Sequence, residues 1–90
     1  MRRSMVHELK TESKYFNAVC KGKKTFEVRV DDRPFAIGAK LKLIEYKDGR
    51  CQYAECNVRI TYILGREEDE KEYVSEGYVI LGIGKVGLEQ

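Results

Sequence analysis

The sequence has little of three residue types that often carry structure or chemistry: one proline, one histidine and three cysteines. It also lacks any apolar run near the roughly 20 residues that a membrane-spanning helix needs, so we expect no membrane partner. The basic start, Met1-Arg2-Arg3, is followed by no apolar signal segment, so we expect a protein that is not secreted. An odd number of cysteines in such a chain predicts reduced thiols and a cytoplasmic location.

The scarce residues give no sign of a metal or cofactor site. Cys20 and Cys56 fall on apolar faces of predicted elements, where free cysteine packs as a small hydrophobe. The spacing of Cys51 and Cys56 is wider than the knuckles typical of structural zinc sites. His7 lies at the end of a predicted strand, which favours a structural role over acid–base catalysis. We therefore expect no metal and no cofactor.

The length and composition, with 42% hydrophobic and 36% charged residues among 90, fit one folded domain, which we place at residues 1–90. The net charge of +2 hides an uneven distribution. Residues 1–50 contain thirteen basic and seven acidic residues, a net +6, whereas residues 51–90 contain four and eight, a net −4. Such separation could steer a polyanion to one face, or it could simply reflect an acidic loop at residues 67–70.

Hydrophobic periodicity predicts a chain of mostly strands with a single main helix. The predicted elements are a strand at 5–9, a helix at 12–21, and strands at 24–30, 40–46, 53–64 and 78–84. Gly22 suits the left-handed residue that ends a helix, Asp48-Gly49 predicts a tight hairpin, and residues 65–77 predict an acidic loop with a short helical turn. So many strands in a short chain must close or leave long edges exposed. We therefore predict an α+β fold, a small, curled, mostly antiparallel β-barrel with one main helix packed on it.

The spacing of apolar residues also predicts which side chains form the core. In the helix, one apolar stripe is formed by Tyr15, Phe16, Val19 and Cys20. In the strand at 53–64, alternation places one set on a single face: Ala54, Cys56, Val58, Ile60, Tyr62 and Leu64. We therefore predict that Tyr15 and Tyr62 lie in the core.

The segment at residues 22–29 concentrates charge at the start of a strand. Its sequence is Gly22-Lys23-Lys24-Thr25-Phe26-Glu27-Val28-Arg29. Strand alternation separates two sets, with Phe26, Val28 and Val30 on one face and Thr25, Glu27 and Arg29 on the other. Such a face could bind a charged, planar ligand, because a guanidinium pairs bidentately. Alternatively, Glu27 and Arg29 form an ordinary ion pair of little energetic value.

This segment resembles the G-x-K-x-x-E-x-R signature of ASCH domains, in the PUA-like superfamily. The flanking segments match in the same order: His7-Glu8-Leu9-Lys10, Asp32-Arg33-Pro34-Phe35-Ala36-Ile37-Gly38, Val58-Arg59-Ile60-Thr61-Tyr62-Ile63-Leu64 and Gly77-Tyr78-Val79-Ile80-Leu81. The resemblance covers about residues 6–84 and is to the small bacterial and phage branch, whose members are mostly uncharacterised.

The resemblance implies a PUA-like β-barrel with a cleft between helix and barrel that holds RNA or a nucleobase. It makes Lys24, Glu27 and Arg29 the signature residues of that cleft, and we expect Lys10 and Lys23 near its rim. The expected function is a small RNA-binding module, with RNA or a nucleoside-like ligand as the partner.

Two other functions stay open. One related group hydrolyses acetylated cytidine with a lysine, a threonine and a glutamate, so Lys24 could act as the base of a similar amide hydrolase. The threonine of that group corresponds to Glu27 here, and Thr25 is not the equivalent residue, so we expect no such hydrolysis. The family's usual Gly-Asp after the turn is Gly38-Ala39 in this chain. The third function is an accessory protein that binds another protein.

Overall fold

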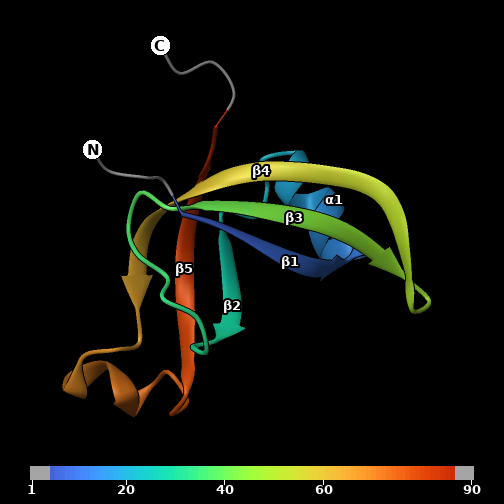
Figure 1. The fold of residues 1–90 in the computed structure, drawn as a ribbon. Helices are drawn as coiled ribbons and strands as arrows, with labels where there is room; N and C mark the ends of the chain where they lie inside the picture. Colours follow the sequence, from blue (N-terminus) through green and yellow to red (C-terminus); the bar gives the residue numbers. More distant parts are fainter. Residues whose placement is uncertain (1–4, 87–90) are drawn as a thin grey trace.

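The computed structural model describes residues 5–86 and consists of one curled sheet with a helix packed at one end (Figure 1). Its elements are β1 (Val6–Glu12), α1 (Ser13–Cys20), β2 (Phe26–Val30), β3 (Lys40–Lys47), β4 (Arg50–Leu64), the 3-10 helix η1 (Glu68–Glu72) and β5 (Tyr78–Lys85). The strand order is β1-β3-β4-β5-β2, and only the β1–β3 pairing is parallel. The prediction of an α+β fold with a curled, mostly antiparallel sheet is confirmed, and the sheet forms a half-barrel.

The long strand β4 gives the sheet its curl. Its first part pairs with β3 and its last part pairs with β5, so one strand belongs to both walls of the half-barrel (Figure 1). The hairpin before it turns at Asp48 and Gly49, with φ of 53° and 77°. These positive values are those of the tight hairpin turn that the dipeptide predicts. The strand begins three residues earlier than the predicted 53, because its ladder with β3 reaches the turn itself.

The core fills the concave side of the half-barrel. Its fully buried side chains are Leu41, Leu43, Val58, Ile60, Val79 and Leu81. The helix α1 covers one end of this core with Phe16 and Val19 and contacts β1, β3 and β4. It ends before Gly22, whose φ of +77° is the left-handed conformation predicted for that position. Cys20 and Cys56 pack against the core, as predicted. Burial, together with the hydrogen bond between the Cys56 thiol and Cys20, raises the pKa of Cys56 to about 11.

The prediction that Tyr62 lies in the core is wrong, because a β-bulge interrupts the alternation of β4. Ile60 pairs with Ile83 and Tyr62 pairs with Gly82, so β4 advances two residues while β5 advances one. A bulge residue shifts every later side chain to the opposite face. Ile63 therefore packs against the core, whereas Tyr62 is 59% exposed on the convex face.

The sheet has two free edges, and the curl brings them close together. β1 and β2 stand at opposite ends of the strand order, yet the Arg29 side chain of β2 hydrogen-bonds to Lys10 and Thr11 of β1. β1 itself runs to Glu12, beyond the predicted end at residue 9, because its parallel ladder with β3 continues to Tyr46. The fold thus places β1, the start of α1 and β2 around one gap.

His7 is buried in β1 and packs edge-on against Phe35, with ring centroids 4.9 Å apart. Its Nε2 atom has no hydrogen-bond partner among the described residues. Burial, with a smaller contribution from the charge of Arg33, holds the pKa of His7 below its ordinary value of 6.5. The folded protein therefore favours neutral His7, because burial makes the protonated form unfavourable in free energy.

We expect the protein to lose stability as the pH falls below about 6.5, because the unfolded chain then binds a proton at His7 that the folded chain does not. The uptake of one such proton lowers the free energy of unfolding by at most about 1.4 kcal/mol per pH unit. Melting temperatures measured from pH 7.5 to 5 should fall less in His7→Asn than in the parent protein. Asp31, whose pKa is lowered by Arg66, titrates below this window. If the melting temperatures of the two proteins fall equally with pH, His7 is not the source of the loss of stability.

Candidate functional site

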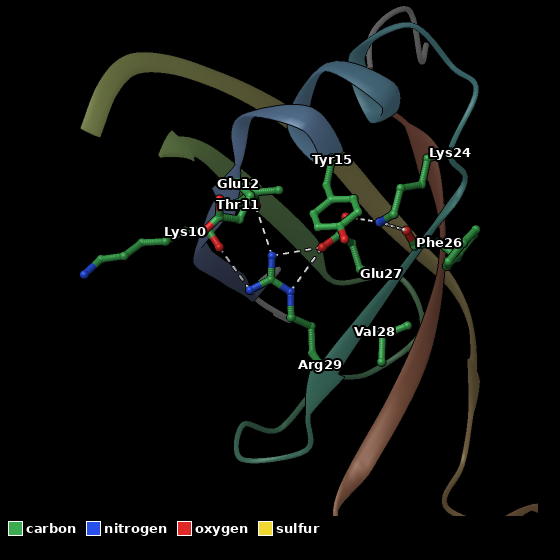
Figure 2. A pocket seen from close by; sticks show the side chains of 9 residues that line it. All are labelled: Lys10, Thr11, Glu12, Tyr15, Lys24, Phe26, Glu27, Val28 and Arg29. Carbon is green, nitrogen blue, oxygen red and sulfur yellow. Dashed lines mark hydrogen bonds and ion pairs between the residues drawn. The ribbon is translucent and has the colours of Figure 1, made fainter. Parts of the chain in front are cut away.

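The gap between the two sheet edges contains a pocket of about 510 Å³. It is bounded by the end of β1, the first turn of α1 and the strand β2, as Figure 2 shows. The lining residues are Lys10, Thr11, Glu12, Tyr15, Lys24, Phe26, Glu27, Val28 and Arg29. A second cavity of about 310 Å³ shares Val28 and Arg29 and continues along β2 toward Arg33. Together they form a groove along the free edge of β2.

A buried carboxylate organises the pocket. Glu27 points inward from β2 and is only 3% exposed. Its Oε2 atom accepts a hydrogen bond from Lys24 Nζ at 2.6 Å. Its Oε1 atom accepts from Arg29 Nε at 3.1 Å and from Arg29 Nη2 at 2.9 Å. Both oxygens are therefore engaged, which is what a charged group removed from water requires.

Arg29 joins the two free edges of the sheet. Besides its bonds to Glu27, Arg29 donates from Nη1 to the backbone carbonyl of Lys10 at 3.1 Å and from Nη2 to the Thr11 hydroxyl at 3.0 Å (Figure 2). These bonds engage four of the five N–H groups of a guanidinium. One guanidinium therefore replaces the strand pairing that a closed barrel would have at this point.

Lys24 lies between aromatic rings at the other end of the pocket. Its ammonium donates to the Phe26 carbonyl at 2.6 Å and lies 4.8 Å from the Phe26 ring centroid and 5.4 Å from that of Tyr15. The two residues are 45% and 44% exposed, and the ammonium of Lys14 also lies 4.9 Å from the Tyr15 ring centroid. The prediction that Tyr15 belongs to the core is wrong. Phe16 and Val19 fill the space under α1, and Tyr15 stands at the edge of the stripe, over the pocket.

The backbone of β2 adds polar groups to the same groove. Ile83 N–H donates to the Thr25 carbonyl, and Asp31 N–H donates to the Gly77 carbonyl, so odd-numbered residues of β2 bond to β5. The alternation of an antiparallel ladder then directs the N–H and C=O groups of Val28 to the free edge. The groove thus offers one donor and one acceptor from the main chain.

Of the two other predicted site residues, Lys10 lines the pocket and Lys23 does not. Lys10 lines the pocket, but its ammonium turns away, 5.0 Å from the ring centroid of Tyr46 (Figure 2). Lys23 is exposed in the turn between α1 and β2 and is not among the lining residues. Thr11, Glu12 and Tyr15 line the pocket and were not predicted as site residues. They lie where β1 passes into α1, and only the position of β1 beside β2 brings them to the site.

Two structural findings bear on other kinds of function. In the part of the chain that the structure describes, no three His, Cys, Asp or Glu side chains are grouped so as to hold a metal ion. The expectation that no metal binds stays a prediction, which elemental analysis of purified protein would test. Among residues 5–86, no helix has the length and apolar character needed to cross a membrane.

The sequence matches a family of proteins described as a domain of unknown function, DUF3850, over residues 6–83. This match covers α1, the whole pocket and every strand apart from Gly84 and Lys85, the last two residues of β5. The chain belongs to the DUF3850 family. It is also 35% identical over 69 residues to a protein of Escherichia phage P2 named "Uncharacterized 12.9 kDa protein in GpA 3'region". That alignment covers 77% of this chain and 63% of the phage protein.

We expect Arg29→Ala to destabilise this DUF3850 domain by about 3 kcal/mol, the usual scale for removing one partner of a buried ion pair. Arg66 offers a matched control, because it also donates twice to one carboxylate, that of Asp31, but is 40% exposed. Arg66→Ala should cost about 0.5 kcal/mol, as exposed pairs do. Urea denaturation of the two variants measures the difference. Equal losses would show that Arg29 does not join the sheet edges in solution.

Proposed function

We propose that this protein is a small nucleic-acid-binding module that holds RNA, or a nucleobase, in the pocket between α1 and β2. The resemblance to ASCH domains of the PUA-like superfamily led to this expectation. The half-barrel with a helix beside the pocket is compatible with that superfamily. The proposal rests chiefly on one observation, the half-exposed Tyr15 ring over a pocket that also contains the signature residues Lys24, Glu27 and Arg29.

The aromatic rings favour a flat ligand. Single-stranded RNA is commonly recognised by stacking of its bases on aromatic side chains and on guanidinium planes. Tyr15 and Phe26 present such rings on either side of Lys24. Val28, which also lines the pocket, directs its main-chain donor and acceptor to the free edge of β2. A base edge, which has donors and acceptors in one plane, is complementary to that pair of groups.

The charges favour a base over a long stretch of phosphates. The two cations nearest the pocket, Lys24 and Arg29, already share the carboxylate of Glu27. Glu12 adds a second negative charge to the lining, and the ammonium of Lys10 lies over Tyr46. The pocket therefore has little net charge to attract a polyanion, and we propose that it binds one nucleotide of a strand, or a free nucleoside.

The hydrolase alternative receives no specific support from the site. The only threonine in the pocket lining is Thr11, whose hydroxyl donates to the Leu9 carbonyl at 3.3 Å and accepts from Arg29. A nucleophilic hydroxyl needs a base that takes its proton, and Glu27 is occupied by Lys24 and Arg29. Binding without catalysis is therefore the function that we propose.

We expect Tyr15→Ala to weaken binding of a short single-stranded RNA by about 1–3 kcal/mol, the usual value of one base stacked on an aromatic ring. Fluorescence anisotropy with labelled 8-mers of each of the four bases measures this loss. Tyr53→Ala is the matched control, since Tyr53 is 95% exposed and lies outside the pocket. Melting curves establish that both variants are folded.

The same titrations at several salt concentrations separate base binding from phosphate binding. A ligand held by one or two phosphates gives a slope of log affinity against log salt of about −0.7 to −1.4. Lys23→Ala should flatten this slope without changing the order of preference among the four bases. The proposal fails if no RNA or nucleoside binds at millimolar protein, or if both tyrosine variants bind like the parent protein.

A further inference from the structure

The second cavity, of about 310 Å³, extends the groove from Arg29 to the turn that follows β2. That turn supplies Asp32 and Arg33, which are both exposed and both line the cavity. Neither side chain forms a hydrogen bond or an ion pair with another residue in the part of the chain that the structure describes. One carboxylate and one guanidinium are therefore free to bind a ligand beside the pocket.

The backbone on both sides of these two residues is held in place. Before them, Asp31 accepts two hydrogen bonds from Arg66, at 2.8 and 2.9 Å, and its own N–H donates to the Gly77 carbonyl. After them, Phe35 is 2% exposed, and its N–H donates to the Arg33 carbonyl at 2.7 Å. A turn that is already ordered loses little conformational entropy when a ligand binds to it.

The charge of Arg33 acts on the wall of the cavity. It contributes, after burial, to the lowered pKa of His7, and the His7 ring packs against Phe35, which lines the cavity. The other guanidinium in this lining belongs to Arg29, which already donates to Glu27 and to two groups of β1. Of the two guanidinium groups, that of Arg33 is therefore the one whose N–H groups are open to an anion.

We propose that the second cavity binds the ribose and the phosphate of the nucleotide whose base lies in the pocket, an inference that rests on the function proposed above. The Arg33 guanidinium donates to the phosphate, because its planar fork matches two phosphate oxygens. The Asp32 carboxylate accepts a hydrogen bond from the ribose 2′-hydroxyl. Val28 and Arg29 line both cavities, so one nucleotide can extend from the first to the second without leaving the groove.

The opposite charges of Asp32 and Arg33 favour a ribonucleotide over other anions. A bare phosphate gains from the guanidinium but is repelled by the neighbouring carboxylate. A ribonucleotide carries a hydroxyl donor near its phosphate acceptors, so it satisfies both side chains at once. A deoxynucleotide leaves the carboxylate near a phosphate with no hydrogen bond to offset their repulsion. Since the 2′-hydroxyl is the group by which a protein tells RNA from DNA, the second cavity makes the groove selective for RNA.

Fluorescence anisotropy with an RNA 8-mer of one base and the 2′-deoxy 8-mer of the same base tests the ribose contact. The parent protein should bind the RNA strand about tenfold more tightly, the scale of one hydrogen bond to a charged group. Asp32→Ala should weaken binding of RNA by about the same factor and should not weaken binding of the deoxy strand. Asp69→Ala removes the same charge from an exposed position of η1 outside both cavities, so it should bind like the parent.

The same strands test the phosphate contact. Arg33→Ala should weaken binding of both strands about tenfold, because it removes a charge-assisted hydrogen-bond donor to the phosphate. It should also make the slope of log affinity against log salt less steep by about 0.7, the value for one phosphate of a single strand. Arg50→Ala is the matched control, since Arg50 is also exposed and lies outside both cavities.

Tyr15→Ala, measured alongside, separates this proposal from the function on which it rests. If Tyr15→Ala loses RNA binding while Asp32→Ala and Arg33→Ala bind both strands like the parent, the base pocket stands and the ribose and phosphate site is overturned. The proposal also fails if the parent binds RNA and the deoxy strand equally, or if Arg33→Ala weakens neither strand. A parent protein that binds neither strand contradicts both proposals. Melting curves establish that each variant is folded.

Discussion

The buried carboxylate of Glu27 is the constraint on which the arrangement of this protein depends. A charge with 3% exposure is stable only when its hydrogen-bonding capacity is met. Lys24 and Arg29 meet it from the same chain segment, because they lie three residues before and two residues after Glu27. Arg29 also hydrogen-bonds to β1, so the side chain that neutralises Glu27 is the one that joins the two sheet edges.

This way of joining the edges explains why the molecule has a pocket where a closed barrel would have a ladder. Strands that pair directly leave about 5 Å between them and no opening. Here one guanidinium spans the gap, so the space on either side of it remains as the two cavities that share Val28 and Arg29. The residues that stabilise the fold at this point are therefore also the lining of the candidate binding site.

The same constraint accounts for the exposed apolar residues of β2. Strand alternation allows only one face to point into the gap, and Glu27 and Arg29 occupy it. The alternating apolar residues of β2 must then face outward, where Val28 pairs with Ile80 and Val30 with Tyr78 of β5. The polar interior of the gap and the apolar convex face are thus two consequences of one strand with reversed polarity.

Local sequence patterns determined the elements and their turns. Gly22 and Asp48-Gly49 have the positive φ angles that a helix end and a tight hairpin need, and these depend only on neighbouring residues. Alternation also grouped Glu27 with Arg29 correctly, since the two-residue repeat of a strand is a local property. The charged segment at residues 22–29, singled out by its resemblance to another family's signature, supplies five of the pocket's lining residues.

Tertiary structure alone decided which faces are buried and which residues meet. Arg29 bonds to residues 18 and 19 positions away, and no local pattern specifies that distance. The bulge before Tyr62 depends on the register between β4 and β5, so alternation along β4 could not locate it. Tyr15 belongs to the helical stripe by spacing, but the gap between β1 and β2 exposes it. Local patterns fix the conformation of a segment, whereas the pairing of distant strands fixes what each side chain touches.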